Sequence, residues 1–230
     1  MLAKILRSSI FLFVAMCWLF SQVTYAATSS QKKLIALTFD DGPSIPYTEQ
    51  VLALLEKHHA KATFFVMGGN VKLHPEILKK VFAAGNVIGN HTYTHPLITK
   101  ISDSALEKEL TKTNEVIFKT IHVYPVLFRP PYGMSSAHTN AVLKKLGLKK
   151  ITWDYMVDDY DYKKTTSEII ARSVLQHARP GAIITMHDGG TNRAKTVAAL
   201  ATIIPTLQQQ GYELVTVADL LHILPYQNEN

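Results

Sequence analysis

Short apolar runs alternate with longer, helix-period segments from about residue 33 to the end of the chain. Each run is rich in Ile, Val, Phe or Thr, which is typical of strands that are covered on both faces. We therefore predict seven strands, over residues 34–39, 62–67, 86–89, 126–129, 150–154, 182–186 and 213–217.

Amphipathic segments separate the predicted strands. Their apolar positions recur with a helical period, Pro75 suits the first turn of a helix, and Gly85 is a typical helix stop. Ser104 and Glu107 have the spacing of a capping box within the longest of these segments. We predict helices over residues 48–59, 75–84, 102–120, 139–146, 166–177 and 195–210, and a short one after Ala218.

The regular alternation of strands and helices predicts the fold class. Repeated βα units form a mostly parallel sheet, and seven units in roughly 200 residues fit a barrel better than two open sheets. No linker rich in Pro, Gly or Ser, internal repeat or change of composition divides the series. We therefore predict an α/β fold, a TIM-barrel-like (β/α) barrel of about seven parallel strands in one domain.

The N-terminal segment up to Ala26 has the pattern of a signal peptide. Lys4 and Arg7 precede an apolar run over residues 10–20, and small residues occur just before the predicted cleavage point. The run of about 11 residues is short for a hydrocarbon core roughly 30 Å thick. We predict that residues 1–26 are removed, leaving 27–230 as an exported domain, periplasmic or secreted, without a membrane span. An uncleaved anchor is the alternative.

Composition adds few constraints beyond a globular domain. Of 230 residues, 47% are hydrophobic and 18% are charged, so the chain is neither disordered nor uniformly membrane-embedded. The single cysteine, Cys17, lies in the predicted signal peptide, which excludes a disulfide framework or a thiolate cluster. The formal net charge is +6, but no long basic block or aromatic-interleaved basic stripe predicts nucleic-acid binding.

Polar and ionisable residues accumulate directly after five predicted strands. In a parallel barrel these positions share the carboxyl-terminal face, where βα loops build active sites. Charge on helix surfaces would not produce this placement, so we predict one functional rim. Its candidate residues are Asp40, Asp41, His91, His95, Arg129, Asp154, Asp158, Asp159, Asp161, His187 and Asp188.

Two histidines and an aspartate of this rim have the composition of a metal site. His91 and His95 are separated so that one helical turn would place both imidazoles on one side. Two histidines and one carboxylate suit Zn²⁺, with Co²⁺ or Ni²⁺ as alternatives. Of the adjacent Asp40 and Asp41, one can bind the metal while the other acts as a base.

Taken singly, the motifs have ordinary structural explanations. Asp-Asp-Gly-Pro is a turn signal, Arg129 fits a surface ion pair, and His187 fits a satisfied core histidine. Taken together, they resemble the polysaccharide deacetylase family, also called the NodB-homology domain or carbohydrate esterase family 4. The resemblance rests on TFDDGP at residues 38–43, HTYTH at 91–95, RPPYG at 129–133 and TMHD at 185–188, which span nearly the whole mature chain.

The resemblance implies a distorted (β/α) barrel and metal-dependent hydrolysis of N-acetyl groups on an N-acetylglucosamine-containing polysaccharide. Peptidoglycan, a chitin oligomer and an exopolysaccharide are all possible substrates. The implied metal ligands are Asp41, His91 and His95. The implied catalytic groups are Asp40 as general base, Arg129 as its orienting partner, the backbone N–H of Tyr132 as oxyanion donor, and His187 as general acid. Amide hydrolysis needs an activated water, charge stabilisation on oxygen and a proton for the leaving nitrogen.

The sequence departs from the family pattern in two places. The usual Asp-x-x-Asp-Trp motif aligns with residues 156–160, which lack its first aspartate and its tryptophan. This alignment makes Asp159 the acid that tunes His187 or Arg129. Thr185 stands where leucine usually helps to line the pocket for the acetyl methyl group. Two alternatives to N-deacetylation follow: an O-acetyl esterase acting on xylan-like glycans, and a glycan-binding protein that has lost turnover.

Overall fold

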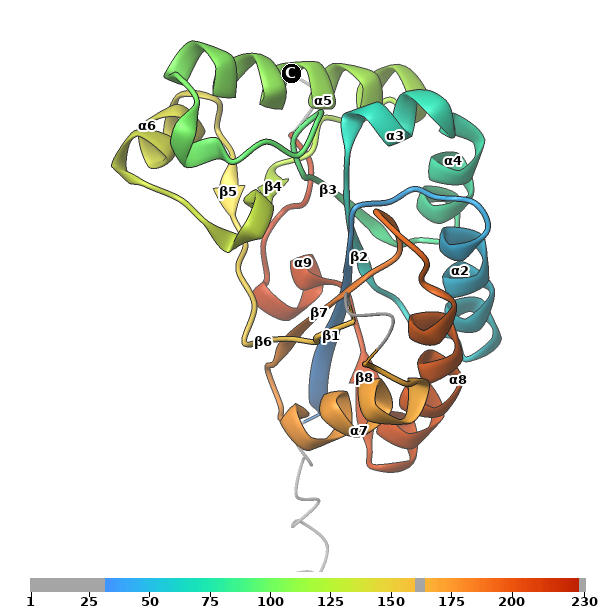
Figure 1. The fold of residues 1–230 in the computed structure, drawn as a ribbon. Coiled ribbons are helices and arrows are strands. Elements are labelled where there is room, and N and C mark those ends of the chain that lie inside the picture. The colour runs from blue at the N-terminus through green and yellow to red at the C-terminus, as the bar shows by residue number, and fades with distance from the viewer. Residues whose placement is uncertain (1–31, 160–163, 228–230) are drawn as a thin grey trace, which may run out of the picture. The chain divides into compact units, whose positions relative to one another are not determined.

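The computed structural model describes residues 32–159 and 164–227. The predicted signal peptide, Tyr160 and Asp161 lie outside the described residues. The described chain is built on a parallel sheet that curls around a central strand, β1 (Figure 1).

Every pair of strands in the sheet is parallel. The spatial order is β5-β4-β3-β2-β1-β7-β6, and β8 pairs with the beginning of β1. This order confirms the predicted α/β fold with a distorted, curled barrel. The strands are β1 (Lys33–Asp40), β2 (Thr63–Val66), β3 (Val87–Asn90), β4 (Leu127–Phe128), β5 (Lys149–Lys150), β6 (Tyr155–Met156), β7 (Ile183–His187) and β8 (Tyr212–Leu214).

The predicted strand over residues 150–154 is wrong, and two short strands at opposite ends of the sheet replace it. β5 pairs with β4, whereas β6 pairs with β7. The backbone between them bonds to both sides: the Ile151 N–H donates to the Phe128 carbonyl at 2.8 Å, and the Asp154 N–H donates to the Ile183 carbonyl at 2.9 Å. One bridging segment therefore connects the two ends of the curled sheet.

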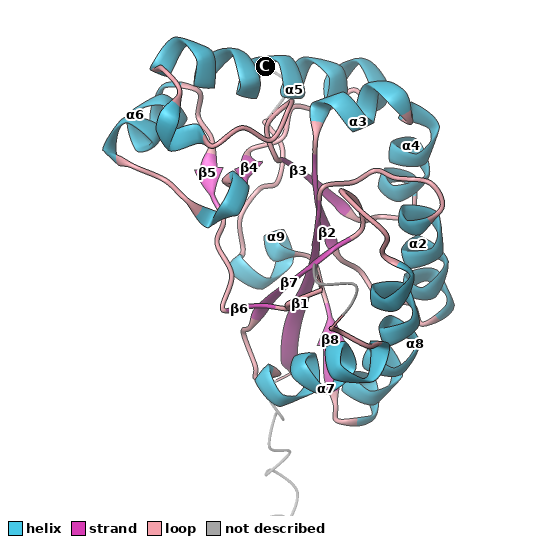
Figure 2. Cartoon of the chain, in the orientation of Figure 1, coloured by secondary structure: helices cyan, strands magenta, loops and turns pink. Residues whose placement is uncertain are grey.

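The helices fall close to the predicted segments and pack around the sheet (Figure 2). A further helix, α3, begins at a glycine pair that the sequence pattern did not assign. The predicted strand over residues 213–217 ends early because the Thr216 hydroxyl caps α9. None of the helices within the described ranges is long and apolar enough to cross a bilayer. The α-helices are α2 (Tyr47–Lys57), α3 (Gly68–Leu73), α4 (Pro75–Ala83), α5 (Asp103–Ile121), α6 (Ala137–Lys145), α7 (Ser167–His177), α8 (Ala194–Gln209) and α9 (Val217–Leu221), with 3-10 turns η1 (Ile98–Lys100) and η2 (Pro131–Gly133).

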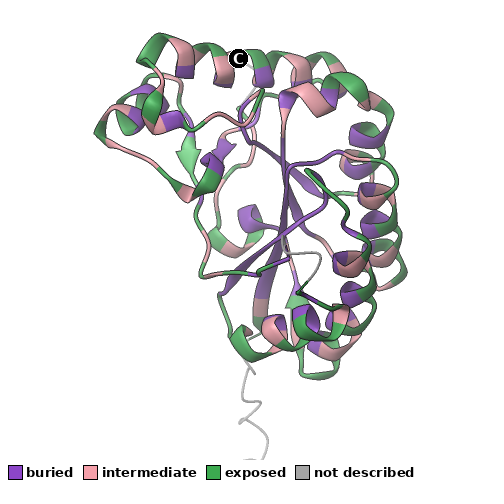
Figure 3. Ribbon diagram, viewed as in Figure 1, coloured by how far each residue is buried: buried purple, intermediate pink, exposed green. Residues whose placement is uncertain are grey.

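Strand β1 is buried along most of its length (Figure 3), and its side chains alternate between two buried clusters. Leu37 and Phe39 pack into the large core shared by the sheet and its helices. Ala36 belongs to a smaller apolar cluster inside the curl. Because successive side chains of a strand point to opposite faces, Thr38 and Asp40 share the inner face with Ala36. The inner face therefore changes from apolar to polar toward the carboxyl end of the strand.

Hydrogen bonding at the start of α5 corrects the predicted capping box. Ser102, not Ser104, is the N-cap residue, and its hydroxyl accepts a hydrogen bond from the Ala105 N–H at 3.2 Å. Ser104 lies in the first turn, with its hydroxyl oxygen 3.0 Å from that of Ser102. The reason is positional, since a capping oxygen must precede the helix to reach the free N–H groups of its first turn.

Replacing Ser102 by Ala should lower the free energy of unfolding by about 1 kcal/mol, because the Ala105 N–H loses its acceptor. Ser104→Ala is the matched control and should cost clearly less. Urea unfolding followed by circular dichroism measures both losses. Equal losses in the two variants would contradict the assignment of the cap.

Candidate active site

The carboxyl ends of four strands bring the candidate residues together. Asp40 ends β1 and His187 ends β7, and the two residues are paired in register. Arg129 follows β4, and its N–H donates to the carbonyl of Asn90, the last residue of β3, at 3.0 Å. Residues in register on neighbouring parallel strands point to the same face of the sheet. These residues therefore meet at one mouth of the curl, as the sequence predicts.

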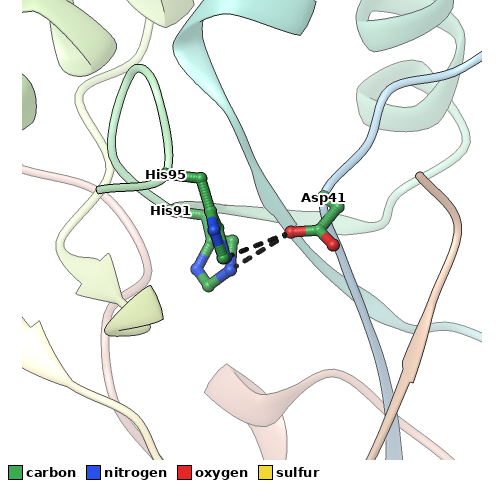
Figure 4. A group of neighbouring side chains, drawn as sticks. All are labelled: Asp41, His91 and His95. Atoms are coloured by element: carbon green, nitrogen blue, oxygen red, sulfur yellow. Dashed lines mark ion pairs between the residues drawn. The ribbon is translucent and has the colours of Figure 1, made fainter. Parts of the chain in front are cut away.

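Asp41, His91 and His95 form a compact group of potential metal ligands (Figure 4). Their ligand atoms lie within 4.8 Å of one another, and both histidine Nε2 atoms are 3.5 Å from Asp41 Oδ1. Within the described part of the chain, this buried carboxylate oxygen has no hydrogen-bond partner. Two imidazoles and a carboxylate that converge in this way fit a divalent cation such as Zn²⁺.

A turn containing left-handed residues, not the predicted helical turn, brings the two histidines together. Thr92 has a φ of 66° and His95 a φ of 60°. Glu109 of α5 holds the turn, because its carboxylate accepts hydrogen bonds from the N–H groups of Tyr93 and Thr94, both at 2.8 Å. The sequence spacing therefore indicates the correct pair, although the expected helical geometry is wrong.

A backbone contact orients the ring of His91. Its Nδ1 lies 2.8 Å from the Arg129 carbonyl oxygen, so Nδ1 donates a proton to that oxygen and Nε2 faces Asp41. Metal-binding histidines commonly use such a hydrogen bond to fix their ring and tautomer. Arg129, which follows β4, thus helps to orient His91, a potential metal ligand that follows β3.

Electrostatic coupling shifts the pKa values of all three potential ligands. Burial raises the pKa of Asp41, but the nearby imidazoles of His91, His187 and His95 outweigh burial and hold it at about 2. Burial lowers the pKa of His91, yet the charges of Asp40 and Asp41 raise it overall. Burial and the charge of His91 lower the pKa of His95. The charged forms of Asp41 and His91 therefore favour each other, and a bound cation would compete with protons for these ligands.

Asp40 is tied to a fully buried arginine. Arg129 Nη1 donates to Asp40 Oδ1 at 2.8 Å and to the Thr38 hydroxyl at 2.6 Å. The guanidinium carbon also lies 4.0 Å from the centroid of the Phe65 ring. Thr185 is buried below the site, with its hydroxyl 3.0 Å from that of Thr38. The polar inner face thus fixes the orientation of Asp40.

Asp159 is the carboxylate beside His187. The His187 Nδ1 lies 2.7 Å from Asp159 Oδ1, and the His187 N–H donates to Asp159 Oδ2 at 3.0 Å. Among the neighbouring acids, Asp158 is exposed, and Asp154 pairs with Arg179 at the other end of β7. The sequence leaves His187 and Arg129 as alternative partners of Asp159, and in the structure Asp159 contacts His187.

Tyr132 lies beside the metal-ligand group in a left-handed turn. Its φ is 57°, and its ring packs edge-on against His95 with 4.6 Å between the ring centroids. A non-glycine residue in this conformation stores on the order of 1–3 kcal/mol and persists only where its surroundings impose it. The next residue, Gly133, has a φ of 68°, and its N–H donates to the Pro130 carbonyl at 3.0 Å. The turn therefore holds the Tyr132 ring against His95.

Three residues with no role predicted from the sequence complete the site. Thr38 supports Arg129, while Arg193 and Thr196 of the α8 region contact Asp159. Arg193 had a usable signal, because a cation immediately before an apolar helix opposes the usual preference for acidic residues there. Thr38 and Thr196 carry no comparable signal, since threonine is common both in strands and in helix starts.

Comparisons with known proteins identify the family. Residues 27–151 match the family model described as polysaccharide deacetylase. A peptidoglycan-N-acetylglucosamine deacetylase of Bacillus cereus is 41% identical over 84% of this chain and 90% of its own. A chitooligosaccharide deacetylase of Rhizobium leguminosarum bv. trifolii is 37% identical over 84% of this chain and 94% of its own. The solved peptidoglycan deacetylase PdaC of Bacillus subtilis has a TM-score of 0.77 and 36% identity, covering 84% of this chain and 91% of that one.

The fold and the site define a carbohydrate esterase family 4 domain. The chain belongs to the polysaccharide deacetylase family, as its four motifs predict. The family assignment therefore rests on independent agreement of sequence, fold and site geometry.

Asp188 is a further buried carboxylate, next to His187 in the chain. It accepts a hydrogen bond from the Thr48 hydroxyl at 2.6 Å, and its N–H donates to the Asp40 carbonyl at 3.1 Å. A Cβ atom on Gly42 would lie 2.3 Å from Asp188 Oδ2, so only glycine fits there. Burial raises the pKa of Asp188 to about 7, against the opposing effect of the Thr48 hydrogen bond.

This raised pKa predicts a pH-dependent loss of stability in the metal-free protein. Between about pH 4 and 7 the folded chain holds a proton on Asp188 that the unfolded chain has released. The stabilisation from Asp188 is therefore lost as pH rises through this window. Asp188→Asn keeps the acceptor for Thr48 but removes the titration. Its unfolding free energy relative to wild type should rise by on the order of 2–4 kcal/mol from pH 4 to pH 8. Urea unfolding with chelator tests this, and a constant difference across pH would contradict it.

Proposed function

We propose that this chain is an exported, metal-dependent enzyme that removes N-acetyl groups from an N-acetylglucosamine-containing polysaccharide. The observation that supports this most strongly is the convergence of three potential metal ligands with Asp40 and His187 at one end of the curl. An amide is a poor electrophile and its amine a poor leaving group. The reaction therefore needs a base, stabilisation of the oxyanion and an acid in one place.

On the base side, Asp40 accepts the proton of the attacking water. Its ion pair with Arg129 keeps the carboxylate oriented, and the backbone N–H of Tyr132 donates to the developing oxyanion. Asp41, His91 and His95 would hold a divalent cation, with Zn²⁺ the first choice and Co²⁺ or Ni²⁺ alternatives. Such a cation supplies Lewis-acid polarisation of water and of the acetyl carbonyl.

On the acid side, His187 delivers a proton to the leaving amine. Its Nδ1 is held by Asp159, which leaves Nε2 as the atom that can donate. The in-register pairing of Asp40 and His187 sets the acid and the base on neighbouring strands. A proton taken on one side of the acetamide can therefore be matched by a proton given on the other.

For the substrate, we propose peptidoglycan as the first polymer to test. The relatives include one named for peptidoglycan N-acetylglucosamine and one named for chitooligosaccharide, and both names refer to N-acetylated glycans. Residues 1–26, as a signal peptide, would deliver residues 27–230 to the compartment of the cell wall. Acetylated xylan belongs in the same assay, because the site could also cleave the easier O-acetyl bond.

Asp40→Asn and His187→Ala should each lower acetate release from the N-acetylated glycan by about 10²- to 10⁴-fold, because each removes a proton-transfer group. Asp158→Asn, at an exposed carboxylate next to Asp159, is the control and should retain activity. Acetate released from peptidoglycan, chitooligosaccharides and acetylated xylan is measured in parallel. Full activity in either active-site variant would reject the roles, and release only from xylan would establish the esterase instead.

Chelation should abolish activity, and added Zn²⁺ should restore it. His95→Ala should weaken Zn²⁺ binding by on the order of 100-fold or more, because one of three protein ligands is lost. His138→Ala is the control, since that histidine pairs with Asp103 outside the site. Isothermal titration of the stripped protein measures the affinity. Zn²⁺ binding unchanged in His95→Ala would disprove the ligand assignment.

A further inference from the structure

Arg193 is a buried cation at an unfavourable place in a helix. It is the N-cap residue of α8, its side chain is fully buried, and that side chain makes no capping hydrogen bond, whereas the Ala194 N–H donates to Asn192 Oδ1 at 3.0 Å. The N-terminus of a helix carries partial positive charge, so an arginine there is disfavoured unless another interaction compensates. Local conflicts of this kind are expected at functional positions.

The compensating contacts of Arg193 connect two loops of the active-site mouth. Its Nη1 donates to the Asp159 carbonyl at 2.9 Å and lies 3.7 Å from Asp159 Oδ1. Its Nε donates to the Gly189 carbonyl at 2.6 Å. Asp159 follows β6 and Gly189 follows β7, so one guanidinium fixes both loops around His187.

The Asp159 carboxylate is held mainly by residues of β7 and α8. Oδ1 faces His187 Nδ1 and Arg193, while Oδ2 accepts from the His187 N–H and, at 2.9 Å, from the Thr196 hydroxyl. Arg193 and Thr196 are three residues apart, which places them on the same side of the first turn of α8. The start of α8 thus supplies both a charge and a hydroxyl to one carboxylate.

Gly190 lies beside both the Asp41 carboxylate and the Arg193 guanidinium. It has a φ of 81°, and a Cβ there would lie 2.9 Å from Asp41 Oδ2 and 3.5 Å from Arg193 Nη2. A side chain at this position would therefore contact both groups.

We propose that Arg193 is a positioning residue for proton delivery by His187, an inference that rests on the proposed function. Arg193 balances the charge of Asp159 and fixes its loop, so that Asp159 Oδ1 keeps the His187 Nδ1–H and leaves Nε2 directed to the leaving amine. Thr196 assists by holding Oδ2. Arg193 itself contacts no reacting atom in this assignment.

The leaving group distinguishes this role from general stabilisation of the fold. Hydrolysis of a chitooligosaccharide needs a proton on the departing amine, whereas 4-nitrophenyl acetate releases a stable phenolate that needs none. Arg193→Met should lower kcat on the oligosaccharide by about 10- to 100-fold with little change in KM. The same variant should hydrolyse the aryl acetate at close to the wild-type rate. Arg193→Lys and Thr196→Val should show smaller losses of the same selectivity.

Combining variants tests whether Arg193 acts through His187. In the His187→Ala background, Arg193→Met should cause little further loss, because the group that it positions is already absent. Arg172→Met, on the exposed side of α7, is the control for loss of an arginine. Equal losses on both substrates, or independent losses in the double variant, would overturn the proposal.

Nitrogen-15 NMR of the histidine rings gives a readout that does not depend on turnover. Wild type should show the neutral His187 ring with its proton on Nδ1, and Arg193→Met should show a mixture of tautomers; His187→Asn identifies the signal. An unchanged tautomer in Arg193→Met and Arg193→Lys would reject the proposal even if the wild type released no acetate from any glycan. If wild type released no acetate from any glycan but the tautomer changed as expected, the proposed function would be rejected and the positioning role of Arg193 would stand.

Discussion

The buried ion pair between Arg129 and Asp40 is the interaction on which the site depends. A fully buried guanidinium is tolerated only with a well-placed anion, and removing one partner of such a pair costs about 3–5 kcal/mol. Arg129 meets this requirement with its side chain, while its carbonyl orients His91 and its N–H joins the end of β3. The proposed base, one potential metal ligand and two strand ends are thus parts of one connected unit.

A second buried arginine repeats this arrangement on the other side of the mouth. Arg129 balances Asp40, and Arg193 balances Asp159, while Asp41 faces imidazoles. Arg129 and Arg193 carry permanent charges, whereas the imidazoles that face Asp41 can lose their protons. That difference makes Asp41 the place where a divalent cation gains most, because metal binding displaces protons from its ligands.

The sequence predicts most of the fold because the strands and helices have distinct periodicities. It also predicts the rim, because polar residues that follow parallel strands must meet at one edge. It fails at residues 150–154, where two hydrogen-bonding partners at opposite ends of the sheet compete for one short segment. It fails again at residues 91–95, where Glu109, distant in the chain, imposes left-handed turns that no local pattern reveals. Arg193 and Thr196 escape detection because their role arises only when α8 packs against Asp159.

The segment between β5 and β6 is a tether of fixed length between the two edges of the curled sheet. Residues 151–154 are bonded at one end to β4 and at the other to β7, and four extended residues reach at most about 14 Å. Trp153, within the tether, packs against the turn at Gly133, and its ring centroid lies 5.6 Å from the Arg129 guanidinium carbon. This segment therefore limits how far β4 and β7 can move apart, and it holds Trp153 beside the guanidinium that orients Asp40.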